Sequence, residues 1–209
     1  MKFDSIILDI DGTIWNTTSI VADAWNKAVD LTGFGCRKVS PEILKGEFGK
    51  PMDEIAFDLW PDLSSKERDE LLKECCVLEQ EAVNENETDI TFPAVIQTVK
   101  ELSDFVNFYI VSNCQSGYIE LVLQKTGLEP YIKDFSCFGY NGKPKSENIK
   151  LIVQRNNLKN PVYVGDTQGD KNSCDQAGVP FIWAEYGVGK VEGAFASLKQ
   201  FSDLKEIIK

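Results

Sequence analysis

Three short apolar runs, each followed by a polar residue, constrain the fold of this chain most strongly. The runs and the residues that follow them are 6–8 with Asp9, 108–111 with Ser112, and 162–164 with Asp166 after a glycine. Continuous β-branched and aromatic runs of this length are typical of strands buried on both faces of a parallel sheet. Stretches with helical spacing separate the runs, so the sequence predicts a Rossmann-like, doubly wound parallel α/β sheet. Ligands of such sheets bind beyond the carboxyl ends of the strands, where the three polar residues lie.

The alternation of strand and helix patterns is interrupted at residues 15–88, which contain helical patterns only. Ser40 before a proline and Ser64 three residues before Glu67 are helix-start signals, and the first helix is expected to stop near Gly33. We therefore expect an α/β core domain of residues 1–14 and 89–209, with an inserted all-helical domain of residues 15–88. Residues 84–91 are expected to form the return hinge. Further strands are expected at 135–138 and 180–183, and a helix at 93–102.

Composition removes several classes of function. The chain has 33 acidic and 22 basic residues, a net charge of −11, which disfavours nucleic-acid binding. Histidine is absent, which excludes a Ser-His-Asp triad, an HExxH zinc site and a phosphohistidine. Six scattered cysteines without a CxxC pair do not indicate a disulfide framework. With no signal-like start and no apolar window long enough for a membrane, we expect a cytoplasmic protein, either a monomer or a homodimer.

Asp9 and Asp11 are the sharpest chemical feature. Two carboxylates this close repel each other unless a cation lies between them, and Mg²⁺ prefers such oxygen ligands. Asp9 is then a nucleophile that attacks phosphorus, while Asp11 gives a proton to the leaving oxygen and takes one from water. Gly12 permits a tight turn in which its N–H and that of Thr13 approach a phosphate. The alternative interpretation, an Asp-Gly turn after a strand, is common for the dipeptide alone.

Two further segments offer ligands at the same sheet edge. Asp166 and Asp170 follow the third run, and with Asp9 and Asp11 they predict an oxygen-ligand Mg²⁺ site. Asp170 in a strand-to-helix loop can alternatively be a helix cap, and it can serve both roles. Ser112 and Asn113 can donate to phosphate oxygens, although a helix N-cap explains Ser112 equally well.

Lysines are the remaining candidates for holding a phosphate. Either Lys143 or Lys145, just before a predicted helix, can neutralise the phosphoryl group together with the attacking carboxylate, and a solvated turn is the alternative. Lys50, in a loop between helices of the insert, is predicted to contact the part of the substrate that does not react; an ordinary surface lysine is the competing interpretation.

Taken in this order, the four segments resemble the haloacid dehalogenase-like hydrolase superfamily over essentially the whole chain. The insert is similar to the helical cap of its phosphoglycolate phosphatase and β-phosphoglucomutase branch. The resemblance implies Asp9 as nucleophile, Asp11 as general acid/base and Mg²⁺ as cofactor. It leaves Lys143 and Lys145 competing, and the distance to the following helix favours Lys145. Asn16 stands where the family usually has aspartate, which alters the chemistry of the hinge, although asparagine can still cap a helix.

The expected function is a phosphatase that hydrolyses a small phosphorylated metabolite through an aspartyl phosphate. A phosphosugar mutase using the same aspartyl phosphate is the main alternative, because both need Asp9 and Asp11. Dehalogenation needs no second aspartate, so Asp11 argues against it. A receiver-like phosphate acceptor has little use for a helical insert that closes over its site.

Overall fold

The computed structural model describes residues 3–208 of the 209-residue chain. It divides into an α/β unit, Met1–Asn16 with Thr91–Lys209, and a helical unit, Thr17–Ile90. Both boundaries lie two residues beyond the expected ones. The two crossing segments pair within the α/β unit: Phe92 N donates to Ile14 O at 2.9 Å, and Trp15 forms an antiparallel bridge with Thr91. This pairing ties Trp15 to the α/β unit.

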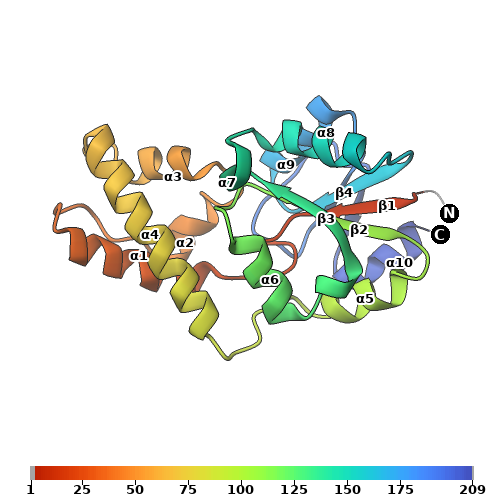
Figure 1. The fold of residues 1–209 in the computed structure, drawn as a ribbon, viewed down its shortest axis with the longest axis horizontal. Coiled ribbons are helices and arrows are strands. Elements are labelled where there is room, and N and C mark those ends of the chain that lie inside the picture. The colour runs from red at the N-terminus through yellow and green to blue at the C-terminus, as the bar shows by residue number, and fades with distance from the viewer. Residues whose placement is uncertain (1–2, 209) are drawn as a thin grey trace. The chain divides into compact units, whose positions relative to one another are not determined.

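A six-stranded, entirely parallel sheet forms the centre of the α/β unit (Figure 1), which confirms the predicted Rossmann-like fold class. Its strands are β1 (Ser5–Leu8), β2 (Asn107–Ser112), β3 (Ile132–Cys137), β4 (Pro161–Gly165), β5 (Phe181–Ala184) and β6 (Ala196–Leu198). The side chains of β1 and most of those of β2 and β4 are buried, as the apolar runs predict.

Strand order places a ligand-binding crevice next to β1. The strands are arranged β3-β2-β1-β4-β5-β6, so the chain winds outward in one direction from β1 to β3 and in the other from β4 to β6. Leu8 of β1 lies beside Ile110 of β2 and Val164 of β4. The order therefore reverses between β1 and β4, and doubly wound sheets bind ligands at such a point. Asp9 and Asp166 directly follow these two strands.

Helices pack on both faces of this sheet. They are α5 (Val95–Leu102), α6 (Tyr118–Thr126), α7 (Phe138–Asn141), α8 (Lys145–Arg155), α9 (Gln168–Ala177) and α10 (Leu204–Ile207), with short 3₁₀ turns at Glu129–Tyr131 and Phe201–Asp203. In Figure 1, α8 and α9 lie on one side of the sheet, and α5 and α10 lie on the other. Ile149 and Ile152 of α8 belong to the same buried cluster as Tyr163 of β4, which fixes the α8 backbone against the sheet.

The helical unit contains α1 (Thr18–Thr32), α2 (Pro41–Lys45), α3 (Met52–Leu59) and α4 (Ser65–Glu85). The predicted start and stop signals are present: Ser40 caps α2, Ser64 and Glu67 form a capping box before α4, and Gly33 ends α1 in the left-handed conformation. A buried cluster that includes Trp25 of α1 gives this unit a hydrophobic core of its own.

Some local expectations were wrong. Residues 84 and 85 belong to α4 rather than to a hinge. Phe138 begins α7 instead of ending β3. Thr17, not Asn16, is the N-cap of α1. The strand β6 was missed, because three residues are too few to show a period. None of the helices within residues 3–208 combines the length and apolar character that crossing a membrane requires.

Candidate functional site

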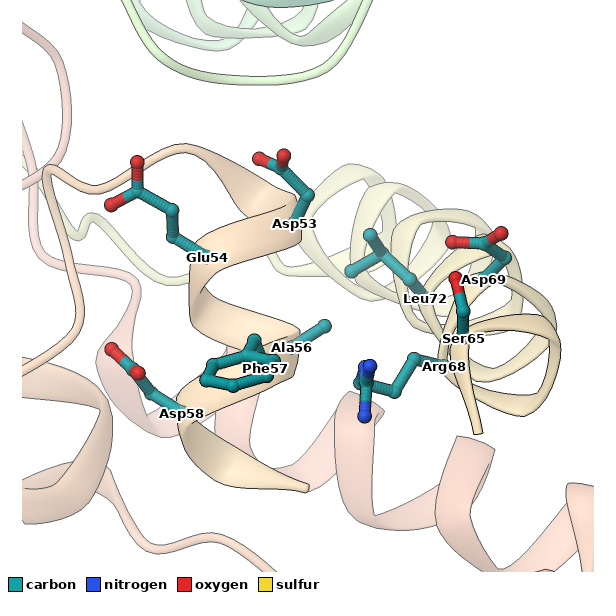
Figure 2. A pocket seen from close by; sticks show the side chains of 9 residues that line it. All are labelled: Asp53, Glu54, Ala56, Phe57, Asp58, Ser65, Arg68, Asp69 and Leu72. Carbon is teal, nitrogen blue, oxygen red and sulfur yellow. The ribbon is translucent and has the colours of Figure 1, made fainter. Parts of the chain in front are cut away.

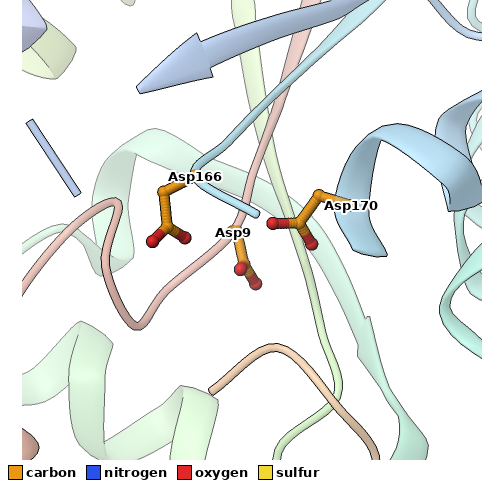
Figure 3. A group of neighbouring side chains, drawn as sticks. All are labelled: Asp9, Asp166 and Asp170. Carbon is orange, nitrogen blue, oxygen red and sulfur yellow. The ribbon is translucent and has the colours of Figure 1, made fainter. Parts of the chain in front are cut away.

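Three aspartates converge at the carboxyl ends of β1 and β4 (Figure 3). Asp9 follows β1, and its N–H donates to Val164 O at 2.9 Å, which continues the sheet pairing by one residue. Asp166 follows β4, and Asp170 lies in the first turn of α9. One oxygen from each carboxylate lies within 4.8 Å of the others, and all three residues are buried. The structure thus brings together three of the four predicted metal ligands.

Lys145 is the cation that faces these carboxylates. Its Nζ lies 3.0 Å from Asp9 Oδ1 and 2.6 Å from Asp170 Oδ1, and its side chain is 2% exposed. It is the first residue of α8, and the packing of that helix on the sheet directs the side chain inward. Lys143 lies two residues earlier on the surface. The structure therefore places beside these carboxylates Lys145, the lysine that the spacing in the sequence favoured over Lys143.

Burial and the neighbouring charges shift the pKa values of the ionisable groups in this site. Burial raises the pKa of Asp9 to about 7, against the opposing charge of Lys145 and with a further contribution from Asp170. Burial also raises the pKa of Asp166 well above its usual range, and Asp170 and Asp9 add to the effect. At Lys145 burial acts to lower the pKa, but the charges of Asp170 and Asp9 raise it overall. Three carboxylates and one ammonium leave a net charge of −2 when fully ionised, which favours a bound cation.

Asp170 uses its two oxygens for different purposes. Oδ2 accepts hydrogen bonds from Thr167 N at 3.0 Å and Thr167 Oγ1 at 2.8 Å, while Oδ1 accepts from Lys145. Thr167 is the N-cap of α9, and Asp170 is its capping-box partner at the third helical position. Asp170 therefore takes part in capping α9 while its other oxygen faces the site, so it serves both of the roles considered for it. The capping box holds the carboxylate rigidly against Lys145.

Asp166 supplies the test of whether a metal fits. Its Oδ2 accepts from Val188 N at 2.8 Å, but its Oδ1 is buried with no hydrogen-bond partner among the described residues. Leaving a buried, potentially anionic oxygen unsatisfied is costly. A hard divalent cation bound by carboxylate oxygens removes that cost, so the donor set fits Mg²⁺.

Backbone packing explains two glycines around Asp166. A Cβ at Gly12, whose φ is +81°, would lie 2.1 Å from Asp166 Oδ2. A Cβ at Gly187 would lie 2.4 Å from both Asp166 Cβ and Gly12 O. The N–H groups of Gly12 and Thr13 donate within the turn, to Trp15 O and Ile10 O. Gly12 is thus required for space beside Asp166, and the predicted phosphate contact of Gly12 and Thr13 stays a prediction.

Asp11 lies outside the three-carboxylate group. Its Oδ1 accepts a hydrogen bond from Trp15 Nε1 at 3.0 Å and another from the Tyr118 hydroxyl at 2.9 Å. The Asp11 carboxylate is therefore not part of the group that could hold a metal ion. A contact between Asp11 and the metal stays a prediction.

Ser112 and Asn113 are at the edge of the sheet where Asp9 lies. Ser112 is the last residue of β2, the neighbour of β1, and it is buried. The next helix begins only at Tyr118, after Gly117, so Ser112 is not a helix N-cap. Contact of Ser112 and Asn113 with a phosphate stays a prediction.

Lys50 lies in the loop between α2 and α3 of the helical unit. Its Nζ is 2.6 Å from Glu47 Oε2 and 2.7 Å from Asp58 Oδ2. These hydrogen bonds, the one with Asp58 first, raise the pKa of Lys50. Two carboxylates therefore already compensate its charge, and its role toward a substrate stays a prediction.

A pocket in the helical unit lies between α3 and α4 (Figure 2). Arg68 stands over the ring of Phe57 at 5.1 Å and donates hydrogen bonds to backbone carbonyls, including that of Leu63. The pocket shares no residue with the predicted site and is lined by Asp53, Glu54, Ala56, Phe57, Asp58, Ser65, Arg68, Asp69 and Leu72.

Several site residues were missed from the sequence. Tyr118 and Trp15 contact Asp11, and the Tyr186 hydroxyl donates to Thr13 O at 2.8 Å. Val188 acts through its backbone, which leaves no residue-type signal. Trp15 stands four residues after Asp11, and Tyr118 opens the helix after Ser112. The signal that the sequence offered was an aromatic residue with a hydrogen-bond donor close to Asp11 and another close to Ser112.

Comparison with known proteins agrees with the fold of the α/β unit and identifies a family. The family profile described as haloacid dehalogenase-like hydrolase matches residues 6–184. No match is found among curated proteins. A solved structure described as a predicted phosphoglycolate phosphatase from Haemophilus somnus superposes with a TM-score of 0.86 at 18% identity, covering 100% of this chain and 99% of that one.

Two further solved structures share the fold. A predicted phosphatase from Clostridium acetobutylicum has a TM-score of 0.85 at 16% identity, with 100% and 99% of the two chains covered. CbbY from Rhodobacter sphaeroides, in complex with xylulose-(1,5)-bisphosphate, has a TM-score of 0.82 at 14% identity, with 97% and 96% covered. The match of the family profile over most of the sequence identifies the family: this chain belongs to the haloacid dehalogenase-like hydrolases.

Proposed function

We propose that this protein is a Mg²⁺-dependent phosphatase that hydrolyses small phosphomonoesters through an aspartyl phosphate on Asp9. The observation that carries the proposal is the buried contact of Asp9 with Lys145, next to two more carboxylates at the switch point of the sheet. A carboxylate nucleophile beside a fixed ammonium suits attack on a phosphoryl group, whose negative charge the ammonium compensates.

In the first step, a carboxylate oxygen of Asp9 attacks phosphorus, and the bond from phosphorus to the ester oxygen breaks. Lys145 compensates the charge on the transferring group, since its ammonium is already 3.0 Å from the nucleophile. Asp11 gives a proton to the departing oxygen, so that an alcohol leaves instead of an alkoxide.

In the second step, water attacks the phosphorus of the phosphorylated Asp9, and Asp11 takes a proton from that water. Inorganic phosphate leaves and Asp9 returns as a carboxylate. Ser112 and Asn113 are proposed to donate hydrogen bonds to the phosphoryl oxygens, together with the turn at Gly12 and Thr13.

Mg²⁺ is proposed to be held by Asp9, Asp166 and Asp170, with Asp11 contributing through its backbone carbonyl. When bound, it neutralises the carboxylates and polarises the phosphoryl oxygens. The orphaned Oδ1 of Asp166 is the structural observation that supports this assignment.

The substrate is proposed to be a small phosphorylated metabolite, with the helical unit of residues 17–90 acting as a cap. CbbY binds a phosphorylated sugar, and other similar structures are described as phosphatases, which supports this class. Lys50 is proposed to contact the part of the substrate that does not react. Among the described residues we find none that favours a phosphosugar mutase over a phosphatase, and the phosphatase is therefore our proposal.

Phosphate release from a panel of small phosphate esters, with Mg²⁺ and with EDTA, tests the proposal. We expect Mg²⁺-dependent release that is absent from the nearly isosteric variant Asp9→Asn, although that variant stays folded. Release by Asp9→Asn at the wild-type rate would exclude an aspartyl phosphate. A phosphorylated protein that transfers its phosphate to a sugar rather than to water would instead indicate the mutase.

A further inference from the structure

We infer that Tyr118 and Trp15 are positioning residues for Asp11, and that together they fix the orientation of its carboxylate for proton transfer to the leaving group. This inference deepens the proposed phosphatase function and rests on it. It starts from one oxygen: Asp11 Oδ1 accepts from Tyr118 at 2.9 Å and from Trp15 at 3.0 Å.

The two donors come from segments far apart in the sequence. Trp15 belongs to the loop after β1, whereas Tyr118 is the first residue of α6, 107 positions after Asp11. Their rings meet edge to face, with centroids 5.8 Å apart and planes at 73°. Each aromatic residue is 1% exposed. The pair is therefore a rigid part of the fold rather than a surface contact that solvent can replace.

Rigidity matters because a general acid must present its proton along the bond that is breaking. A carboxylate on a single-bonded stem samples several orientations unless its neighbours fix it, and small misplacements near the reacting atoms slow catalysis strongly. Two donors on Oδ1 fix the rotation of the Asp11 carboxyl group. They also use both lone pairs of Oδ1, so that a proton carried by Asp11 resides on Oδ2.

The proton balance follows from this arrangement. The proton on Oδ2 goes to the ester oxygen as the bond from phosphorus to that oxygen breaks and phosphorus bonds to Asp9. In the second step, a proton of the attacking water returns to Oδ2. Tyr118 and Trp15 keep their own protons throughout and act only through Asp11.

Leaving-group dependence distinguishes positioning of an acid from a general structural role. An alkyl phosphate needs a proton on its departing oxygen, whereas 2,4-dinitrophenyl phosphate leaves as a stable anion without one. The parameter kcat/KM reports the first step, in which that proton moves. We expect Tyr118→Phe to lower kcat/KM for alkyl phosphates about 10- to 100-fold, a part of the usual 10²–10⁴ of general acid catalysis. For 2,4-dinitrophenyl phosphate we expect a loss below about threefold.

Tyr109→Phe is the matched control. Tyr109 is a buried tyrosine in the middle of β2, where it is paired with Ile7 of β1 and Asp134 of β3. Its loss is expected to affect the two ester types equally and slightly. Trp15→Phe removes the second donor while keeping an aromatic ring, and we expect it to change the ratio of the two kcat/KM values in the same direction as Tyr118→Phe.

A double-mutant cycle makes the inference stricter. If Tyr118 acts through Asp11, Tyr118→Phe adds little to Asp11→Asn, so the combined loss is far smaller than the product of the single losses. Equal losses of Tyr118→Phe on both ester types, or fully multiplicative losses, would overturn the positioning role while leaving the phosphatase proposal intact. Failure of the wild-type protein to release phosphate from any ester would instead overturn the phosphatase proposal.

Discussion

The ammonium nitrogen of Lys145 lies 3.0 Å from Oδ1 of Asp9, and both side chains are almost completely buried. Such a pair is held by the surrounding fold, since separating the two charges would leave each of them unsolvated. The same ammonium contacts Asp170, whose other oxygen belongs to the capping box of α9. Lys145 therefore links the proposed nucleophile to a helix N-terminus, and its removal affects both stability and chemistry.

Lys145→Ala is expected to lower turnover of phosphate esters by at least about 100-fold, because the charge that compensates the phosphoryl group is lost. In the absence of metal it should also lower the free energy of unfolding by about 3–5 kcal/mol, the usual cost of breaking a buried ion pair. Steady-state kinetics and urea unfolding in EDTA measure the two effects. Lys143→Ala is the control, since Lys143 is exposed. Near-wild-type turnover and stability of Lys145→Ala would refute the role of Lys145 in compensating the charge of the phosphoryl group.

Gly187→Ala is expected to abolish Mg²⁺-dependent activity. The new methyl group would meet Asp166 Cβ and Gly12 O, both 2.4 Å away, and one of the two segments must shift. Gly169→Ala is the comparison, because a Cβ there meets only Thr167 Oγ1 at 3.5 Å, an ordinary contact. Isothermal titration with Mg²⁺ should show weaker binding only for Gly187→Ala. Equal affinity in both variants would mean that the position of Asp166 does not govern the metal site.

Ser64→Ala is expected to destabilise the helical unit by about 1 kcal/mol, because it removes the N-cap of the 21-residue helix α4. The hydrogen bonds that Ser64 Oγ accepts from Glu67 N–H and donates to Glu67 Oε2 are lost with it, whereas the backbone N–H of residue 64 keeps its bond to Glu67 Oε2. Hydrogen exchange should become faster in the first turns of α4 and stay unchanged in the central strands. Ser65→Ala changes the neighbouring serine without removing a cap, so a similar effect of that variant would argue against capping.

The sequence predicted most of the sheet, because parallel strands buried on both faces leave continuous apolar runs. It also predicted helix starts wherever a cap residue precedes a helical pattern, as at Ser40 and Ser64. Residues 84 and 85 were assigned to the hinge instead of α4, because a polar composition does not reveal where a long helix ends. The short strand β6 carries no period that a pattern can detect.

Within the site, Asp9, Asp166 and Asp170 were predictable since each stands at a fixed place after a buried strand. Lys145 was preferred to Lys143 only on its distance to the following helix, because the orientation of a residue at a helix start depends on how that helix packs. The contacts of Asp11 with Tyr118 and Trp15 depend on tertiary structure and on no spacing rule. Val188 N, which donates to Asp166, could not be predicted because every residue except proline offers a backbone N–H.

The raised pKa of Asp9 predicts how the stability of the metal-free protein depends on pH. Folding raises this pKa from 3.8 to about 7, so the folded state binds more protons than the unfolded state between about pH 4 and 7. The contribution of Asp9 to stability therefore falls as pH rises through this window. The raised pKa of Asp166 acts in the same direction. In EDTA, we expect the melting temperature to decrease more steeply between about pH 4 and 7 for wild type than for Asp9→Asn.

Mg²⁺ should reverse this trend, because it binds the deprotonated carboxylates and competes with protons for them. The increase in melting temperature caused by a saturating amount of Mg²⁺ is expected to be larger at pH 8 than at pH 5. Differential scanning fluorimetry with matched EDTA and Mg²⁺ samples measures it across the pH series. Asp9→Asn separates the causes, since it removes one titrating carboxyl group and one proposed ligand while keeping the shape of the side chain. An increase that is independent of pH in the wild-type protein would mean that Mg²⁺ stabilises it at a place other than the buried group of Asp9, Asp166 and Asp170.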